Sequence, residues 1–122
     1  MKKNILIVDD SESIREVVSL GLKGAGYNVV AGINGEDGLR LLTENPNVQL
    51  IITDLNMPVM DGIAFLKVVR TMPQYKYLPI IILTTESQEA KKQEAKNAGA
   101  TGWIIKPFVK EKLLAVVKKL VH

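Results

Sequence analysis

The feature that most constrains the fold of this 122-residue chain is a fivefold alternation of short apolar segments with stretches of helical periodicity. The apolar segments are brief, rich in isoleucine and valine, and bounded by glycine, proline, asparagine or aspartate, as buried strands usually are. Their sequences are NILIVDD from Asn4, YNVVAGI from Tyr27, VQLIITD from Val48, LPIIILTT from Leu78 and TGWIIKP from Thr101. We interpret them as five β-strands.

The stretches between and after the strands predict five helices, over residues 11–25, 36–44, 62–72, 87–98 and 110–121. In the first of these, Ser11 or Ser13 is available as an N-cap, and the Gly-Ala-Gly of residues 24–26 ends the helix. Strands that alternate with helices imply parallel pairing, right-handed crossovers and helices on both faces of the sheet. The predicted fold class is therefore α/β, an open, doubly wound parallel sheet.

Length and composition indicate one domain over residues 1–122, with no separate output domain. A hydrophobic content of 47% is enough for one sizeable core. No apolar run is long enough to span a bilayer, and the N-terminus reaches two aspartates too soon for a signal peptide. The absence of cysteine fits a cytoplasmic location. We therefore expect a soluble cytoplasmic protein that acts without a membrane.

Polar residues follow the strands at the points where the strands end. The first strand ends in Asp9 and Asp10, the third in Asp54, the fourth in Thr84 and the fifth in Lys106. Because parallel strands end at a shared edge, where ligands of such folds bind, these side chains are expected to converge. Singly, each has an ordinary explanation, namely a turn or cap residue, a strand former or a solvated lysine. Their joint placement favours a site.

The chemistry of this set points to phosphoryl transfer. Crowded carboxylates recruit a cation, and oxygen ligands from Asp9, Asp10, Asp54 and one backbone carbonyl suit Mg²⁺. With Lys106 and the Thr84 hydroxyl added, the site can receive the oxygens of a phosphoryl group. An aspartate can accept that group as an acyl phosphate, and Asp54 is the best candidate because it ends the central strand.

The segments ILIVDDS, IITDLNMPVMDG, PIIILTT and KPF together resemble the receiver domain of two-component response regulators. The resemblance runs from about residue 4 to residue 120, and its motifs occur in order at family-like spacing. It implies a flavodoxin-like fold with five helices and the strand order 2-1-3-4-5, which is known for a member of this family and is taken over from it.

The resemblance implies a role for each site residue. Asp54 accepts a phosphoryl group from a sensor histidine kinase, Asp9 and Asp10 hold Mg²⁺, and Asn56 gives its backbone carbonyl to the metal. Thr84 and Lys106 bind the phosphoryl group, and the bond before Pro107 is cis. Thr84 and Trp103 are the switch residues, although tryptophan replaces the usual tyrosine or phenylalanine, and a half-buried packing residue without a switching role is the alternative. Asn56 and Glu86 tune the phosphoryl lifetime.

The closest resemblance is to stand-alone chemotaxis-type regulators. It implies a monomer that is not an enzyme beyond its own phosphorylation and autodephosphorylation, with a chemotaxis-type kinase, a flagellar switch protein and a phosphatase as partners. The output face is implied to comprise the fourth helix, fifth strand and fifth helix, where an acidic partner segment would fit the lysines. These are Lys91, Lys92, Lys96, Lys110, Lys112, Lys118 and Lys119.

Other classes of function fit the sequence less well. A Mg²⁺-dependent phosphohydrolase with an aspartyl-phosphate intermediate, of the haloacid dehalogenase type, needs a second carboxylate two residues after the nucleophile, where this chain has Asn56. Neither a P-loop nor a dinucleotide-binding fingerprint is present. The net charge of +3 is modest and no helix-turn-helix is recognisable, so no nucleic-acid partner is expected.

Overall fold

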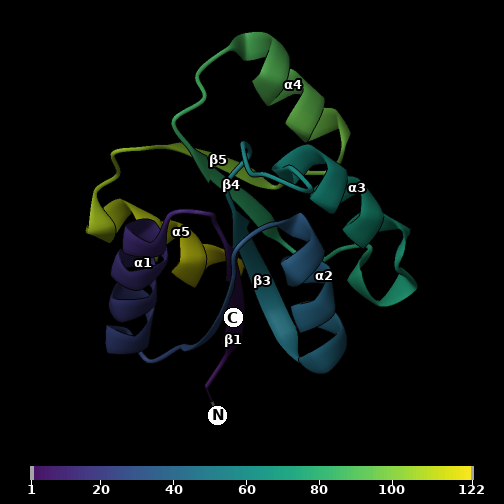
Figure 1. Ribbon diagram of the computed structural model, residues 1–122. Helices are drawn as coiled ribbons and strands as arrows, with labels where there is room; N and C mark the ends of the chain where they lie inside the picture. The colour runs from purple at the N-terminus through teal and green to yellow at the C-terminus, as the bar shows by residue number, and fades with distance from the viewer. Residues whose placement is uncertain (1, 122) are drawn as a thin grey trace.

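The computed structural model describes residues 2–121 and contains one five-stranded sheet with helices on both faces (Figure 1). The strands are β1 (Asn4–Val8), β2 (Asn28–Gly32), β3 (Val48–Thr53), β4 (Ile80–Thr84) and β5 (Gly102–Ile105). All neighbouring strands are parallel, and their order across the sheet is β2-β1-β3-β4-β5. The α/β class is confirmed, and so is the strand order taken from the family resemblance.

Four α-helices and one short 3-10 helix connect the strands, and a fifth α-helix follows the last strand. They are α1 (Glu12–Gly24), α2 (Gly35–Glu44), α3 (Gly62–Thr71), η1 (Pro73–Tyr75), α4 (Glu89–Asn97) and α5 (Lys110–Leu120). The bounds predicted from the sequence differ from these by at most two residues at any helix end. The sequence prediction missed η1, which begins at a proline because the fixed φ of proline suits a first helical turn.

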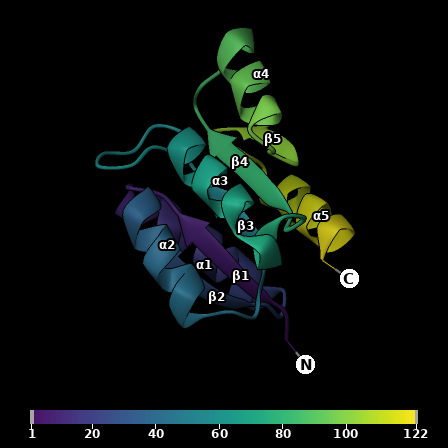
Figure 2. The same cartoon turned by 90° about the vertical axis from the view of Figure 1, so that its right-hand side faces the viewer.

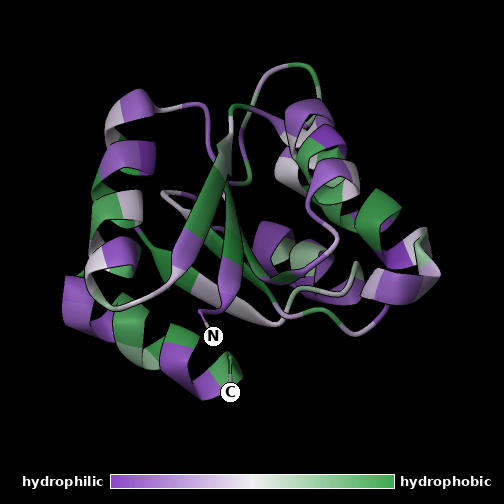
Figure 3. Cartoon of the chain, turned by 90° about the horizontal axis from the view of Figure 1, so that it is seen from below, coloured by the Kyte–Doolittle hydropathy of each residue, from purple (hydrophilic) through white to green (hydrophobic). Residues whose placement is uncertain are grey.

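The helices form two layers, which Figures 1 and 2 show on opposite sides of the sheet. Alternate residues of the strands point to opposite faces, so Ile5 and Ile7 pack with α1 and α5 while Leu6 and Val8 pack with α2 and α3. Figure 3 shows the result as largely hydrophobic strands between helices whose outward sides are mostly hydrophilic. Within the described residues, no helix has the length and apolar character needed to cross a membrane.

Side chains cap the first three helices at their N-termini, but not the last two. The capping residues are Ser11 of α1, Asn34 of α2 and Asp61 of α3, and each accepts a hydrogen bond from the backbone N–H three residues later. Of the two serines that the sequence suggested as the N-cap of α1, Ser11 and Ser13, Ser11 is the one that caps the helix. Helix α4 has no side-chain cap, and Ala95 is its one buried residue. It is the helix least anchored to the core.

The loop from β3 to α3 returns to its starting point through Gly62. The backbone N–H of Gly62 donates to the Leu55 carbonyl over 2.8 Å, which closes the loop directly behind Asp54. A Cβ atom on Gly62 would collide with the Asp54 carbonyl oxygen and would lie 2.8 Å from the Leu55 Cα. Only glycine allows this close approach.

We predict that Gly62→Ala lowers the free energy of unfolding by about 1–3 kcal/mol, because the added methyl group overpacks a site lined by backbone. Gly24→Ala is the matched control, since nothing lies within 4 Å of a Cβ at the last residue of α1. This control should stabilise the fold by roughly 0.5–1 kcal/mol through helix propensity. Urea unfolding of both variants measures the difference, and equal stabilities would contradict the close approach at Gly62.

Candidate functional site

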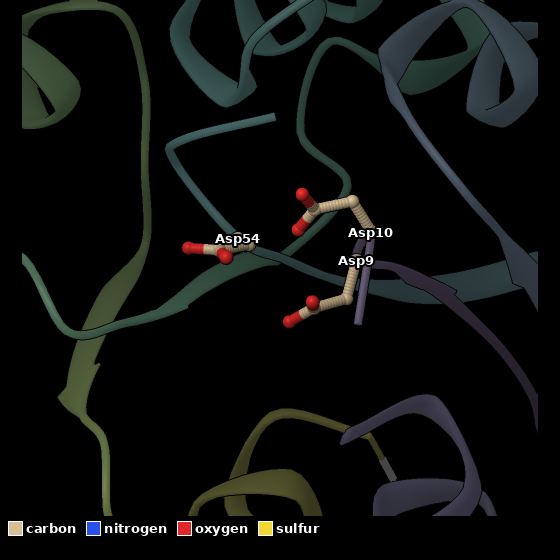
Figure 4. A group of neighbouring side chains, drawn as sticks. All are labelled: Asp9, Asp10 and Asp54. Carbon is tan, nitrogen blue, oxygen red and sulfur yellow. The ribbon is translucent and has the colours of Figure 1, made fainter. Parts of the chain in front are cut away.

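Three carboxylates gather at the carboxyl edge of the sheet. Asp9 and Asp10 follow β1, Asp54 follows β3, and one oxygen from each lies within 4.8 Å of the others (Figure 4). Asp9 and Asp54 are buried, whereas Asp10 is exposed. The structure therefore brings these three residues together at this edge, as their positions after the strands predicted.

Lys106 reaches this cluster from the end of β5. Its Nζ lies 2.7 Å from Asp9 Oδ2 and 3.2 Å from Asp54 Oδ2, so one ammonium group contacts two buried carboxylates. The side chains are only 11% (Lys106), 3% (Asp9) and 12% (Asp54) exposed. Lys106 is thus a partner of the carboxylates and not a solvated loop residue. The peptide bond that follows it, to Pro107, is cis, as the resemblance implied.

Backbone amides hold the other oxygen of each buried carboxylate. Ser11 N–H donates to Asp9 Oδ1 over 2.9 Å, and Leu55 N–H donates to Asp54 Oδ1 over 2.6 Å. Arg15, which sequence reasoning did not single out, donates from Nη1 to the Asp9 backbone carbonyl over 2.8 Å. Each carboxylate is therefore fixed in orientation by one amide and one ammonium contact.

Burial and ion pairing act in opposite directions on the charges of the site. Burial raises the pKa of the Asp9 carboxyl above its ordinary value, although hydrogen bonds from Lys106 and Ser11 act to lower it. Burial also acts to lower the pKa of Lys106, but the hydrogen bond to Asp9 and the negative field of Asp54 outweigh it, and the pKa is raised. The contact with Lys106 thus favours the ionised form of Asp9 against the effect of burial.

The donor set fits a hard divalent cation. Three carboxylates and one ammonium group leave a formal charge of minus two, which is the charge that Mg²⁺ neutralises. Carboxylate oxygens are the ligands that Mg²⁺ prefers, and the exposed Asp10 carboxylate opens the cluster to water ligands. Asn56 lies exposed in the loop two residues after Asp54.

Thr84 and Glu86 organise the loop between β4 and α4. Thr84 is fully buried at the end of β4, and its Oγ1 accepts the Glu86 N–H over 3.2 Å. The Glu86 carboxylate in turn accepts the Gln88 N–H over 3.2 Å. Since β3 and β4 pair in parallel at Thr53 and Ile82, Thr84 ends its strand at the same edge as Asp54.

Trp103 lies in β5, opposite Ile82 of β4. It is partly buried against a small apolar cluster that includes Ile82 and Ala95 of α4. It also lines a surface hollow of about 330 Å³ together with Lys92 and Lys96 of α4. The ring of Trp103 is therefore half-buried beside α4. This position is compatible both with a switch residue and with a packing residue, the two interpretations that the sequence left open.

The structure adds a strained turn that the sequence did not predict. Val59 has a φ of 69°, and the Met60 N–H donates to the Pro58 carbonyl over 2.8 Å across it, which forms a three-residue γ-turn. A β-branched residue in this region costs about 1–3 kcal/mol. The carbonyl of Met60 accepts the Gly35 N–H of α2 over 3.0 Å, so the turn is held against a helix.

Comparison with known proteins gives one consistent family. The response regulator receiver domain matches residues 5–118. A probable chemotaxis protein CheY of Rhizobium etli is 41% identical over 118 residues, which cover 96% of this chain and 91% of that protein. A chemotaxis protein CheY homolog of Campylobacter jejuni is 40% identical, over 89% of this chain and 88% of that protein.

Solved structures agree with the sequence relatives. The chemotaxis protein CheY4 of Vibrio cholerae superposes with a TM-score of 0.94 at 45% identity, over 99% of this chain and 100% of that chain. A putative response regulator from Chloroflexus aurantiacus superposes with a TM-score of 0.92 at 35% identity, over 98% of both chains. The likeness therefore covers nearly the whole fold, including the edge that carries the carboxylates.

We predict that Lys106→Met destabilises the fold in a pH-dependent way. Burial already raises the pKa of Asp9 in the folded protein, and loss of the Lys106 ammonium raises that pKa further. A carboxyl with a raised pKa in the folded state lowers the free energy of unfolding as the pH rises through that folded pKa. The deficit relative to wild type should grow between about pH 4 and pH 7, towards roughly 3 kcal/mol.

Urea unfolding at a series of pH values measures this deficit. Lys67→Met, which removes an exposed lysine of α3, is the control and should show no such trend. A deficit for Lys106→Met that is constant across the pH series would contradict the coupling to the buried carboxylates.

Proposed function

The chain belongs to the response regulator receiver domain family, and from this premise we propose that Asp54 accepts a phosphoryl group from the phosphohistidine of a sensor kinase. The observation that carries the proposal is the ammonium of Lys106 on both Asp9 and Asp54, at the one edge where the three carboxylates meet. Receiver domains of this kind are regulators and not classical enzymes, so the chemistry is confined to the domain's own aspartate.

In the proposed transfer, an oxygen of Asp54 attacks phosphorus while the bond from phosphorus to the donor imidazole nitrogen breaks. The electron pair of that bond goes to the imidazole, and the product is an acyl phosphate on Asp54. The Leu55 N–H orients the Asp54 carboxylate, and the Lys106 ammonium lies where it can pair with a phosphoryl oxygen. Mg²⁺ held by Asp9, Asp10, Asp54 and the Asn56 carbonyl would neutralise the charge of carboxylate and phosphoryl oxygens.

The signal would leave the site through Thr84. Its hydroxyl is fully buried and accepts only from the loop amide of Glu86 among the contacts of the described residues, so its own proton is available to a phosphoryl oxygen. A move of Thr84 towards Asp54 would make room for Trp103, because Trp103 pairs with Ile82, which lies two residues before Thr84 on the same face of β4. Asn56, two residues after Asp54, and Glu86, two residues after Thr84, would set how long the phosphoryl group survives.

We assign the protein to chemotaxis on the names of its relatives. Its phosphodonor would be a chemotaxis-type histidine kinase, and its target an acidic segment of a flagellar switch protein. The face of α4, β5 and α5 supports this partner by charge, because exposed lysines flank the half-buried Trp103. Lys92 and Lys96 line the hollow beside that ring.

The first test is covalent labelling. Incubation with acetyl phosphate and Mg²⁺ should add one acid-stable, base-labile phosphoryl group, detected by mass spectrometry, and Asp54→Asn should abolish it. Asp37→Asn, at the N-terminus of α2, is the control and should still be labelled. An adduct that persists in Asp54→Asn would contradict the assignment of the acceptor. Steady turnover of small phosphomonoesters by the wild-type protein would favour the phosphohydrolase instead.

The second test concerns the metal. Mg²⁺ should stabilise the fold against urea by about 2.7 kcal/mol at a hundred times its Kd, since it binds only the folded state. Asp10→Asn removes one proposed ligand from an exposed position and should abolish most of this gain, whereas Glu111→Gln of α5 should keep it. NaCl at equal ionic strength is the control for screening. Equal gains in Asp10→Asn and wild type would contradict the proposed site.

A further inference from the structure

Helix α4 is attached to the rest of the molecule mainly at its two ends. In Figures 1 and 2 it projects beyond the other helices, and Ala95 is its one buried residue. A surface groove of about 410 Å³ lies between α4 and Lys67 of α3. The groove is lined by Lys67 of α3 and by Ala90, Gln93, Glu94, Asn97 and Ala98. Packing against the core therefore contributes little to its position.

The C-terminal end of α4 is held by Arg70 of α3. The guanidinium donates from Nε and Nη2 to the Gly99 carbonyl, over 3.2 Å and 2.7 Å, and from Nη1 to the Tyr75 carbonyl of η1 over 2.9 Å. One side chain thus joins α3, η1 and the end of α4. A positive charge at this end also complements the helix dipole.

The contact between Arg70 and Gly99 requires a glycine at position 99, because of its backbone conformation and because of the space that Arg70 occupies. Gly99 has a φ of 110° and ends α4 in a Schellman motif, in which Gly99 N–H donates to Lys96 and Ala100 N–H donates to Ala95. A Cβ atom on Gly99 would lie 2.8 Å from Arg70 Nε and 3.1 Å from its Cγ, so the Arg70 side chain approaches Gly99 where other residues carry a side chain. Within the described residues Arg70 has no carboxylate within 4.0 Å, and its hydrogen bonds go to backbone carbonyls.

The N-terminal end of α4 is held differently, through the loop that follows Thr84. Gln88, the N-cap residue, makes no side-chain cap hydrogen bond, and the loop amide of Glu86 depends on the Thr84 hydroxyl as acceptor. If Thr84 turns to a phosphoryl group, Glu86 loses that acceptor. The two ends of α4 therefore differ. Phosphorylation would remove the hydrogen bond that Thr84 accepts near the N-terminal end, whereas the hydrogen bonds of Arg70 to Gly99 at the C-terminal end would remain.

We propose that Arg70 is a positioning residue that fixes the C-terminal end of α4 and makes it the hinge about which the helix moves on activation. The fixed end can be tested on the unmodified protein, while the movement rests on the proposed function. A hinge at Gly99 changes the hollow between Lys92, Lys96 and Trp103, which lies between α4 and β5. Arg70 thereby sets how strongly the output face responds, although it lies outside that face.

The test compares Arg70→Met and Arg70→Lys with wild type by amide hydrogen exchange. Arg70→Met should speed exchange of residues 94–100 about tenfold relative to the amides of α1, the loss expected for hydrogen bonds from a charged group. Arg70→Lys keeps the charge without the planar fork and should restore part of the protection. Arg40→Met, which removes an exposed arginine paired with Asp37 and Glu44, should leave the ratio between α4 and α1 unchanged.

A merely structural role for Arg70 predicts a different result. General destabilisation would speed exchange in α1 and α4 by the same factor, with urea unfolding shifted to match, and would overturn the proposal. Unchanged exchange of residues 94–100 in Arg70→Met would overturn it as well. Both readings are taken without phosphorylation, so they do not depend on the proposed function.

The hinge is tested by adding beryllofluoride, whose occupancy at Asp54 is followed by fluorine NMR. In wild type, residues 86–92 should exchange faster and Trp103 fluorescence should change, while residues 94–100 stay protected. In Arg70→Met both ends should loosen. Equal loosening of both ends in wild type would contradict the hinge. If neither the exchange of residues 86–92 nor the Trp103 fluorescence changes at full beryllofluoride occupancy, the switch in the proposed function and the hinge movement are both contradicted. The attachment of the C-terminal end of α4 by Arg70 is then still decided by the exchange comparison without beryllofluoride.

Discussion

The contact of Lys106 with Asp9 and Asp54 is the interaction on which the rest of the structure depends. It joins the ends of β1, β3 and β5, from positions 97 and 52 residues apart in the chain. Burial raises the pKa of the Asp9 carboxyl, and the ammonium group of Lys106 opposes that rise while it also contacts Asp54. The same contact ties Asp54 to the end of the strand that carries Trp103. One side chain therefore joins Asp54 to β5 directly, across the edge of the sheet.

Anchoring is distributed unevenly around this site. Helices α1, α2 and α3 are capped by side chains and bury apolar faces on the sheet, which fixes Asp9, Asp54 and their loops. Helix α4 has no side-chain cap and buries a single alanine, and hydrogen bonds of Arg70 and Thr84 hold the segments at its two ends. Local unfolding and motion occur where few apolar contacts are formed. The fold thus combines a firmly held cluster of carboxylates with a loosely held α4.

Much of this arrangement follows from the sequence, because it depends on short-range patterns. Apolar strands that end in Asp9, Asp54, Thr84 and Lys106 must share an edge once the sheet is parallel, and the helix bounds were accurate to within two residues. The strand order came from the family resemblance and not from periodicity. The clamp of Arg70 on Gly99 could not be predicted, because it joins residues 29 apart whose sequence neighbourhoods look like an ordinary helix face and an ordinary helix end.

The turn at Val59 shows why a strained residue also escapes sequence reasoning. Valine disfavours positive φ, so its residue type argues against the conformation it adopts. The conformation persists because the loop is fixed on both sides, by the amide of Gly62 on Leu55 and by the carbonyl of Met60 on Gly35. These two hydrogen bonds hold the loop between Asp54 and α3, and Asn56 lies in the same loop. The strain at Val59 is therefore a consequence of holding that loop close to Asp54, and it arises from tertiary contacts that no local pattern records.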